Sequence, residues 1–298
     1  MKSAPVIIDG PVVVGGVGGS GTRLIAEILR EAGFYLGKDL NTALDNLWFT
    51  VLLKRPDIFQ KPSTAKTEIF SRLSVFTKLM RGDSSLTWHE RAYIIHAITG
   101  MMIHGHDYRH AGRGLWTLQR GFSMIHRENN PRSVSIGWGW KEPNTHIFIE
   151  YLDEFFSTLK YIHVIRHGLD MAFSSNQAQL FNWGSVFGIE RPRTMEAIPR
   201  ASLEYWIRAN QRICRLAATM EDRFLVINFD NLCVSPESGI RRILEFLGLR
   251  TMDDEKIHRL CLIPRKPESM GRYREHDLSC FPEHLLDEVR EFGFPIEG

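Results

Sequence analysis

The chain has 298 residues, of which 43% are hydrophobic and 24% charged, values typical of a globular protein that buries a large core without disulfides or metals. Its 37 Lys and Arg residues nearly balance its 35 Asp and Glu residues, and the net charge of +2 argues against binding nucleic acid through bulk charge. We therefore expect no nucleic-acid partner, although a local basic pocket is compatible with this total.

The first predicted unit is a strand, a glycine loop and a helix. Residues 12–17 (VVVGGV) form a β-branched run, and apolar residues from Leu24 to Ala32 recur at spacings of three and four, with Gly33 at the expected helix end. The loop 15–23 (GGVGGSGTR) joins them. Its glycines let several backbone N–H groups point at one anion, and the positive end of the following helix adds to the attraction. This unit predicts phosphate binding.

The loop departs from the nucleotide-kinase signature GxxxxGK[ST]. Gly16 and Gly21 have the spacing of that signature, but Thr22 stands where the lysine is required. A kinase would lose the cation that bridges its outer phosphates, so the loop argues against an ATP-dependent kinase. A kinase with a displaced lysine stays open as an alternative, supported by Asp230, an acid after a hydrophobic strand that could hold a metal.

Residues 50–135 fit the strand–helix rhythm poorly. We interpret them as a mainly helical insertion that caps the site, with Trp88 to Met102 as its best helix. His104, His106 and Asp107 are close enough in sequence for a metal site, but a polar helix end or loop is the commoner interpretation of such a cluster, and we expect no metal.

Cationic and aromatic side chains gather in and near this insertion. The arginines form solvated surface or, alternatively, a basic rim for an anionic or sugar acceptor: Arg109, Arg113, Arg120, Arg127 and Arg132. The tryptophans could stack on an adenine, a sugar or an aromatic acceptor, although tryptophans lie more often in a core: Trp116, Trp138 and Trp140.

Two further strand–helix units follow. Residues 159–166 (LKYIHVIR) read as an apolar strand, and a helix is expected to start near Met171. After an amphipathic helix over 201–220, residues 223–229 read as a strand, and Pro236 opens a helix that Gly248 ends. Alternating strands and helices predict an α/β fold with a central parallel sheet flanked by helices. Binding sites in such sheets lie beyond the carboxyl ends of the strands.

Cysteine usage and hydropathy bear on the compartment. The four cysteines form no CxxC pair, which argues against a structural zinc site, and we expect free, mostly buried thiols in a reducing cytosol: Cys214, Cys233, Cys261 and Cys280. The N-terminal apolar run is interrupted by Asp-Gly-Pro and makes no convincing secretion signal. No stretch reaches the roughly 20 apolar residues of a membrane helix. We therefore expect a cytoplasmic protein without a membrane span.

Four motifs resemble those of the sulfotransferases that use 3′-phosphoadenylyl sulfate (PAPS). That family's loop commonly reads Lys/Arg-Ser-Gly-Thr-Thr, and residues 19–23 (GSGTR) match three of its five positions. Its second motif is a strand ending in Arg with a Ser eight residues later, the spacing of Arg166 and Ser174. Residues 138–152 look like the Lys-[Asp/Glu]-Pro element of tyrosyl-protein and several bacterial members, and residues 265–278 resemble the segment that closes over the nucleotide.

The resemblance implies a P-loop sulfotransferase architecture and an activity. The protein would transfer the sulfuryl group of PAPS to a hydroxyl or amine of an unidentified small-molecule or carbohydrate acceptor, leaving adenosine 3′,5′-bisphosphate (PAP) and requiring no metal. It also implies one sulfotransferase domain over 1–298. The nucleotide-binding core would cover about 12–35 and 138–278, and the acceptor-binding insertion about 50–135.

The resemblance also implies a set of donor-binding residues. Arg166 at a strand end can grip a phosphate through two parallel hydrogen bonds, and with Ser174, on the second turn of the next helix, it would bind the 3′-phosphate. The C-terminal segment would add further ligands to the same group. The implied set is Gly18, Gly19, Ser20, Gly21, Thr22, Arg23, Arg166, Ser174, Arg265, Lys266, Ser269 and Arg272.

Lys141, Asp45 and Arg23 are the implied catalytic residues. Lys141 would touch the transferring group, while Asp45 falls where heparan-type relatives carry a catalytic Glu and is the candidate general base, with Asp39 as the alternative. Gly19 stands where most members carry a catalytic cation, so Arg23 or Lys141 would supply the missing charge, together with loop N–H groups. A protein that binds the nucleotide without catalysis is a third alternative.

Overall fold

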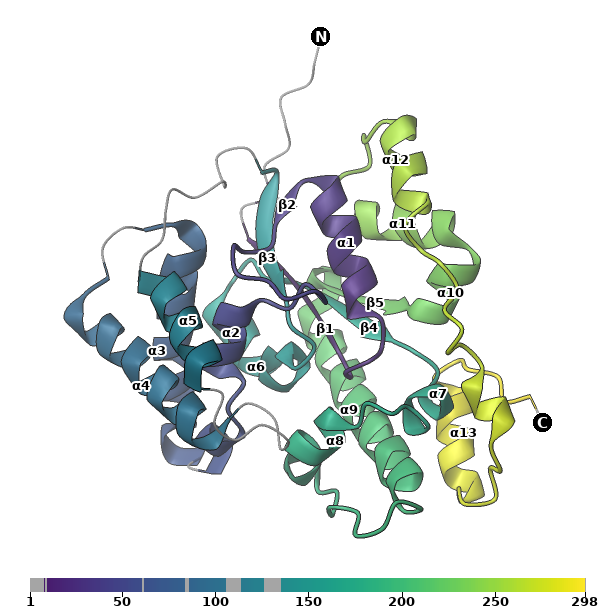
Figure 1. The fold of residues 1–298 in the computed structure, drawn as a ribbon. Helices are drawn as coiled ribbons and strands as arrows, with labels where there is room; N and C mark the ends of the chain where they lie inside the picture. Colours follow the sequence, from purple (N-terminus) through teal and green to yellow (C-terminus); the bar gives the residue numbers. More distant parts are fainter. Residues whose placement is uncertain are drawn as a thin grey trace.

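The computed structural model describes residue 8 and residues 10–60, 62–83, 86–105, 114–125 and 135–297. Within these residues, five strands form one parallel sheet in the order β2-β3-β1-β4-β5 (Figure 1). The strands are β1 (Pro11–Gly16), β2 (Phe34–Tyr35), β3 (Gly137–Lys141), β4 (Lys160–Ile165) and β5 (Phe224–Asn228). This confirms the predicted α/β class with a central parallel sheet.

Helices connect and cover these strands. They are α1 (Thr22–Ala32), α2 (Leu47–Leu53), α3 (Pro62–Arg81), α4 (Trp88–His104), α5 (Gly114–Ile125), α6 (Thr145–Phe155), α7 (Gly168–Ala172), α8 (Ala178–Trp183), α9 (Ile198–Met220), α10 (Phe229–Val234), α11 (Pro236–Phe246), α12 (Asp254–Cys261) and α13 (Glu283–Glu291). The predicted helix over 24–32 is α1, the amphipathic helix over 201–220 is α9, and the helix opened by Pro236 is α11.

Alternation along the strands buries both faces of the sheet, because successive side chains point to opposite sides. Val12 and Val14 of β1 pack in one cluster with α1, α11 and α12. Val13 and Tyr161 belong to the opposite cluster, which includes α6 and α9. Figure 1 shows these helices on the two sides of the strands. Because the strands are parallel, the loops after β1, β3, β4 and β5 gather at one edge of the sheet.

Helices α2 to α5 follow β2 in the chain and precede β3, and they lie beside the sheet at the end that carries β2 (Figure 1). Trp138 and Trp140 of β3 are fully buried, and the Trp140 ring stacks on Phe49 of α2 with centroids 5.5 Å apart. These two tryptophans are therefore core residues that join the sheet to α2, rather than residues that stack on a ligand. Trp116 of α5 packs partly buried against the same cluster.

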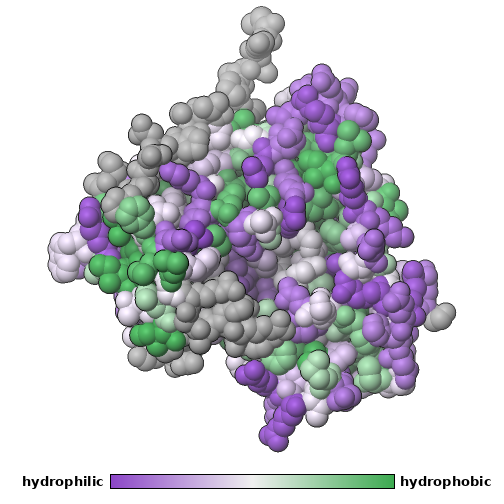
Figure 2. Space-filling model, viewed as in Figure 1, coloured by the Kyte–Doolittle hydropathy of each residue, from purple (hydrophilic) through white to green (hydrophobic). Residues whose placement is uncertain are grey.

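Several large apolar side chains on α4 and α5 are exposed, and Figure 2 shows them as hydrophobic surface over these helices: Ile95, Ile103, Leu115, Leu118 and Phe122. Among the described residues, no helix combines the length and the hydropathy that crossing a membrane requires. The four cysteines are free, as expected, but only Cys233 is buried; Cys214 and Cys280 are exposed, so the expectation of mostly buried thiols is wrong.

Candidate active site

The glycine loop lies between β1 and α1. Gly19 and Gly21 have φ values of 96° and 94°, in the left-handed region that favours glycine. A Cβ on Gly21 would lie 2.1 Å from the Phe229 ring, so this position also lacks space for a side chain. The backbone N–H of Ser20 donates to the Val17 carbonyl at 2.9 Å, but its buried hydroxyl has no partner among the described residues. In this conformation the Ser20 N–H is already engaged, whereas its hydroxyl has a free hydrogen-bonding capacity within the described part of the chain.

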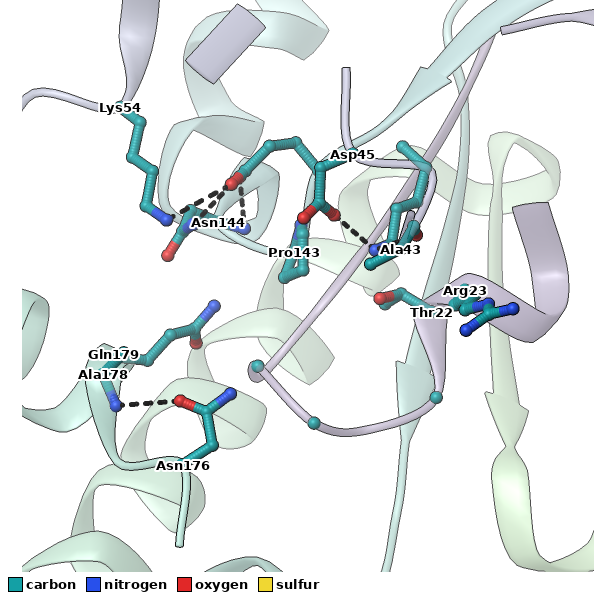
Figure 3. A pocket seen from close by; sticks show the side chains of 15 residues that line it. Thr22, Arg23, Ala43, Asp45, Lys54, Pro143, Asn144, Asn176, Ala178 and Gln179 are labelled. Atoms are coloured by element: carbon teal, nitrogen blue, oxygen red, sulfur yellow. Dashed lines mark hydrogen bonds and ion pairs between the residues drawn. The ribbon is translucent and has the colours of Figure 1, made fainter. Parts of the chain in front are cut away.

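A pocket of about 360 Å³ opens beside this loop, at the carboxyl end of the sheet (Figure 3). The loop forms one side, and segments after β2, β3 and α7 form the others. The lining residues are Gly18, Gly19, Gly21, Thr22, Arg23, Ala43, Asp45, Lys54, Lys141, Glu142, Pro143, Asn144, Asn176, Ala178 and Gln179. The pocket is thus lined by most of the predicted loop residues and by all three predicted catalytic residues: Arg23 from the loop, and Asp45 and Lys141 from distant segments.

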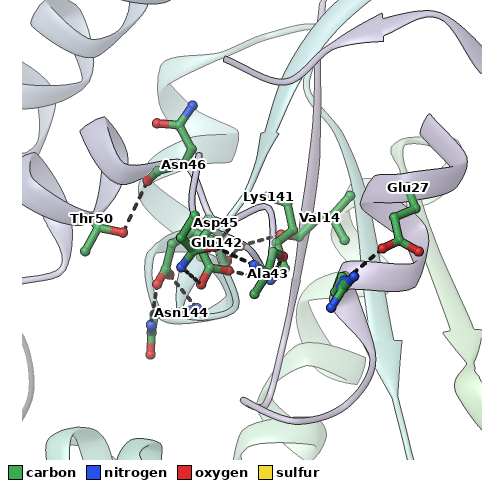
Figure 4. Close-up of polar contacts among 12 residues, drawn as sticks. Val14, Glu27, Ala43, Asp45, Asn46, Thr50, Lys141, Glu142 and Asn144 are labelled. Carbon is green, nitrogen blue, oxygen red and sulfur yellow. Dashed lines mark hydrogen bonds and ion pairs between the residues drawn. The ribbon is translucent and has the colours of Figure 1, made fainter. Parts of the chain in front are cut away.

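Lys141 and Asp45 form an ion pair in the wall of this pocket (Figure 4). Lys141 ends β3 and is almost completely buried, and its ammonium also donates to the Ala43 carbonyl at 3.0 Å. The other Asp45 oxygen accepts from Asn41 Nδ2 at 2.8 Å. A backbone bond from Asn46 N to Lys141 O, 2.8 Å long, ties the two segments together. Lys141 is therefore no surface lysine, and the pair is held from both sides.

Lys54 and Glu142 form a second charged pair, which the sequence had not assigned. Lys54 follows α2, and its Nζ lies 3.6 Å from Glu142 Oε1. The Glu142 carboxylate is buried and accepts two 2.7 Å hydrogen bonds from Asn144, one from the backbone N–H and one from Nδ2 (Figure 4). Burial raises the pKa of Glu142, and the Lys54 ammonium opposes this shift. No motif signals Lys54, because only tertiary packing brings it to Glu142.

Arg166, directly after β4, joins the glycine loop to the C-terminal segment. Its Nη2 donates to the Ser269 carbonyl at 2.7 Å and to the Ser269 hydroxyl at 3.0 Å, while Nη1 reaches the Gly19 carbonyl at 3.5 Å. Arg272 Nε donates to the same Ser269 carbonyl at 3.2 Å. Burial lowers the pKa of Arg166, and the Asp170 carboxylate, 3.6 Å away, opposes this. Three predicted ligands, Arg166, Ser269 and Arg272, are therefore neighbours.

Other predicted residues lie apart from these groups. Ser174 is not on a helix, because α7 ends at Ala172; its hydroxyl accepts from Asn176 N at 3.2 Å, and it lines a separate pocket of about 320 Å³. Arg265 and Lys266 are exposed. Arg23 lies at the pocket rim with 61% of its side chain exposed, and it pairs with Glu27 of its own helix at 2.8 Å.

The alternative acids have other partners. Asp39 accepts from the Ser123 hydroxyl at 2.8 Å and pairs with Arg120 at 2.9 Å, so it lies outside the pocket wall. Asp230 accepts the backbone N–H of His167 at 3.0 Å. In the part of the chain that the structure describes, no group of three or more His, Cys, Asp or Glu side chains could hold a metal ion. The candidate cluster at His106 and Asp107, and most of the predicted basic rim, lie outside the described residues.

The chain was compared with known protein families and structures. A family model described as the sulfotransferase family matches residues 11–254. No curated protein matches the chain. Among solved structures, the sulfotransferase domain of the Synechococcus PCC 7002 olefin synthase is 13% identical with a TM-score of 0.48, and the alignment covers 99% of this chain and 98% of that one. A Mycobacterium avium sulfotransferase is 15% identical with a TM-score of 0.46, over 99% and 78% of the two chains.

Proposed function

The chain belongs to the sulfotransferase family, and from this premise we propose that it transfers the sulfuryl group of PAPS to a hydroxyl or amine of a small-molecule or carbohydrate acceptor. The observation that carries the proposal is the ion pair of the buried Lys141 with the partly exposed Asp45, in the pocket beside the glycine loop. A cation and a carboxylate next to an anion-binding loop are the groups that a transfer between a phosphosulfate and a hydroxyl requires.

The donor would be held from two sides. The glycine loop and the N-terminus of α1 attract the 5′-phosphosulfate, and the Ser20 hydroxyl, buried without a partner among the described residues, can donate to it. Arg166, Ser269 and Arg272 form a cationic group suited to the 3′-phosphate. Arg166 Nε is buried and likewise has no partner in the described part of the chain. A buried donor without a partner is expected where a bound anion accepts its hydrogen bond. We assign Ser174, Arg265 and Lys266 a secondary role at most, because they lie outside this group.

The catalytic roles follow from position. Negative charge builds on the departing nucleotide oxygen in the loose transition state expected for such a transfer. Lys141 stabilises that charge and replaces the cation missing at Gly19, while Arg23 contributes only from the rim. Asp45 accepts the proton that the acceptor hydroxyl loses, and its bonds to Asn41 and Lys141 fix its orientation.

Calorimetry with PAP and ADP tests the donor assignment. We expect PAP to bind at least about tenfold more tightly, because hydrogen bonds to a charged group contribute about 1.5–3 kcal/mol. Tighter binding of ADP, with a strict Mg²⁺ requirement, would instead indicate a kinase. Nucleotide binding without transfer of labelled sulfuryl to any sugar, phenol, lipid or peptide would indicate a non-catalytic protein.

Variants at the 3′-phosphate group make this test specific. Arg166→Ala and the less buried Arg272→Ala should weaken PAP binding and leave ADP binding unchanged. Arg200→Ala, an exposed arginine paired with Glu204, is the matched control and should change neither. Equal losses of affinity for both nucleotides would show that these arginines do not bind the 3′-phosphate.

A further inference from the structure

The side of the pocket beyond the Lys141–Asp45 pair is polar. Of the described residues that line the pocket, the apolar ones apart from glycine are Ala43, Pro143 and Ala178. The remaining side chains on this side are charged or amide groups from three separate segments: Lys54, Glu142, Asn144, Asn176 and Gln179. Figure 3 shows Lys54, Asn144 and Gln179 grouped on the side away from α1.

Gln179 of α8 offers a hydrogen-bond donor. Its Oε1 accepts from the Tyr205 hydroxyl at 3.2 Å, and this bond sets the orientation of the amide. Its Nε2 has no partner among the described residues, although the residue is only 8% exposed. A Cβ on Gly18 would lie 3.3 Å from this nitrogen, so the amide lies against the glycine loop. A ligand that it binds would therefore adjoin the transferring group.

Asn144 offers the complementary acceptor. Its Nδ2 donates to Glu142 at 2.7 Å, which turns Oδ1 away from that carboxylate. Oδ1 has no partner in the described part of the chain, and the residue is 2% exposed. Lys54 adds further donors nearby, since one ammonium carries three N–H groups and Glu142 faces it at 3.6 Å.

Buried polar atoms without partners are rare in folded proteins because each one is costly, and two in the lining of one pocket indicate a ligand that supplies the missing bonds. We propose that Lys54, Asn144 and Gln179 form an acceptor subsite for a polyhydroxylated molecule, a sugar or related polyol. A hydroxyl group both donates and accepts, so neighbouring hydroxyls can satisfy Asn144 Oδ1 and Gln179 Nε2 together. This inference rests on the proposed function, since it names the acceptor class of that site.

The same lining disfavours other acceptors. A phenol or a fatty alcohol would need an apolar or aromatic wall, and most of the large exposed apolar side chains lie on α4 and α5 instead. The specificity of the subsite thus comes from hydrogen bonds of a ligand's hydroxyl groups to the donor Gln179 Nε2 and the acceptor Asn144 Oδ1.

Binding, measured apart from transfer, tests the subsite. Saturation-transfer NMR is recorded with and without PAP, using methyl glycosides of common hexoses and myo-inositol as polyols, and 4-nitrophenol and 1-octanol as competitors. We expect at least one polyol to bind and neither competitor to displace it. Gln179→Met removes the donor at similar volume and should weaken polyol binding about tenfold. Tyr205→Phe frees the Gln179 amide to rotate and should give a smaller loss.

Gln211→Met is the matched control, because Gln211 of α9 donates to Glu288 at 2.9 Å and does not line the pocket. It should leave polyol binding unchanged. Preference for the phenol or the fatty alcohol, no binding of any polyol, or polyol binding that Gln179→Met does not alter would overturn the proposal. Polyol binding by a chain that fails to bind PAP would refute the donor assignment and leave this subsite standing.

Discussion

In the proposed mechanism, Lys141 at the end of β3 supplies the positive charge that position 19 of the glycine loop lacks. Gly19 has no side chain to offer, and the Arg23 guanidinium pairs with Glu27 along the surface of α1. Lys141 and Lys54 are therefore the buried or half-buried cations that line this pocket among the described residues. Of the two, Lys141 is adjacent to the candidate base Asp45, which places it nearest the group that would transfer.

Lys141→Ala should lower kcat by about 100-fold or more, the usual effect of removing one preorganised charge from a transition state. The affinity for PAP should change little, since Arg166 and Arg272, which we assign to its 3′-phosphate, are left intact by this substitution. Transfer assays and calorimetry on the same preparations separate these two effects. Lys66→Ala, an exposed lysine paired with Glu154, is the control. An unchanged kcat would remove Lys141 from catalysis.

The position of a site residue could be predicted from sequence where a motif fixes a side chain within a few positions of a strand end, and its role stays a prediction. Lys141 ends β3 and Arg166 follows β4, so the parallel sheet brings them to the same edge. Lys54 and Gln179 could not be found in this way, because each reaches the pocket through the packing of a helix. Ser174 kept its spacing from Arg166, but α7 ends two residues before it and its side chain lies beside another pocket.

Among the elements, the glycine loop depends on the close approach of α10, whose Phe229 ring lies against Gly21. Gly21→Ala should therefore combine backbone strain with a steric clash. Strain alone is measured by Gly248→Ala, since Gly248 has φ 75° and open space around its Cβ position, and should cost about 1–2 kcal/mol of unfolding free energy. Urea denaturation should show a larger loss for Gly21→Ala, with PAP binding reduced as well. Equal losses would mean that Phe229 moves aside freely.

A buried carboxylate, Asp170 of α7, helps Arg166 to hold the C-terminal segment, residues 265–278. Asp170 accepts the backbone N–H of Gly271 at 2.8 Å and of Tyr273 at 3.2 Å, and it also faces Arg166. Asp170→Asn should weaken PAP binding about tenfold, because charge-assisted hydrogen bonds contribute about 1.5–3 kcal/mol. Hydrogen exchange at Gly271 and Tyr273 should also accelerate. Asp277→Asn, at an exposed site, is the control; unchanged exchange in Asp170→Asn would show that other contacts hold the segment.

Element prediction from sequence was accurate for strands rich in β-branched residues and for long amphipathic helices. Two strands were missed for physical reasons. β2 has two residues, too few for a periodic pattern, and β3 (GWGWK) alternates glycine with tryptophan, which resembles neither a β-branched run nor a polar–apolar alternation. Their pairing with the sheet depends on contacts with β1 and on the aromatic cluster around Trp140, and these are tertiary.

At the scale of the whole molecule, two neutral histidines lie buried on the face of the sheet that α6 and α9 cover. His146 Nδ1 hydrogen-bonds the Pro143 carbonyl at 2.9 Å, and its Nε2 lies 3.3 Å from the Tyr205 hydroxyl, whose proton the Gln179 amide oxygen accepts; His163 hydrogen-bonds Asn210 at 2.8 Å. Burial lowers the pKa of His146 to about 3 and that of His163 to about 4. The same Tyr205 hydroxyl orients Gln179, so this interior is continuous with the proposed acceptor subsite.

These histidines make the stability of the fold dependent on pH. The unfolded chain binds protons near pH 6.5, whereas the folded chain does not until about pH 4, so stability is greatest above pH 6.5 and falls as the pH drops between these values. Each histidine contributes to the free energy of unfolding a slope of about 1.4 kcal/mol per pH unit, while the raised pKa of Glu142 acts in the opposite direction.

His163→Gln keeps a polar partner for Asn210 and removes the contribution of one histidine to this slope. Urea denaturation at pH 7, 6 and 5 should therefore show the variant's stability falling less steeply by about that amount, with exposed His258→Gln matching the wild type. Parallel slopes for all three proteins would mean that His163 takes up its proton in the folded state.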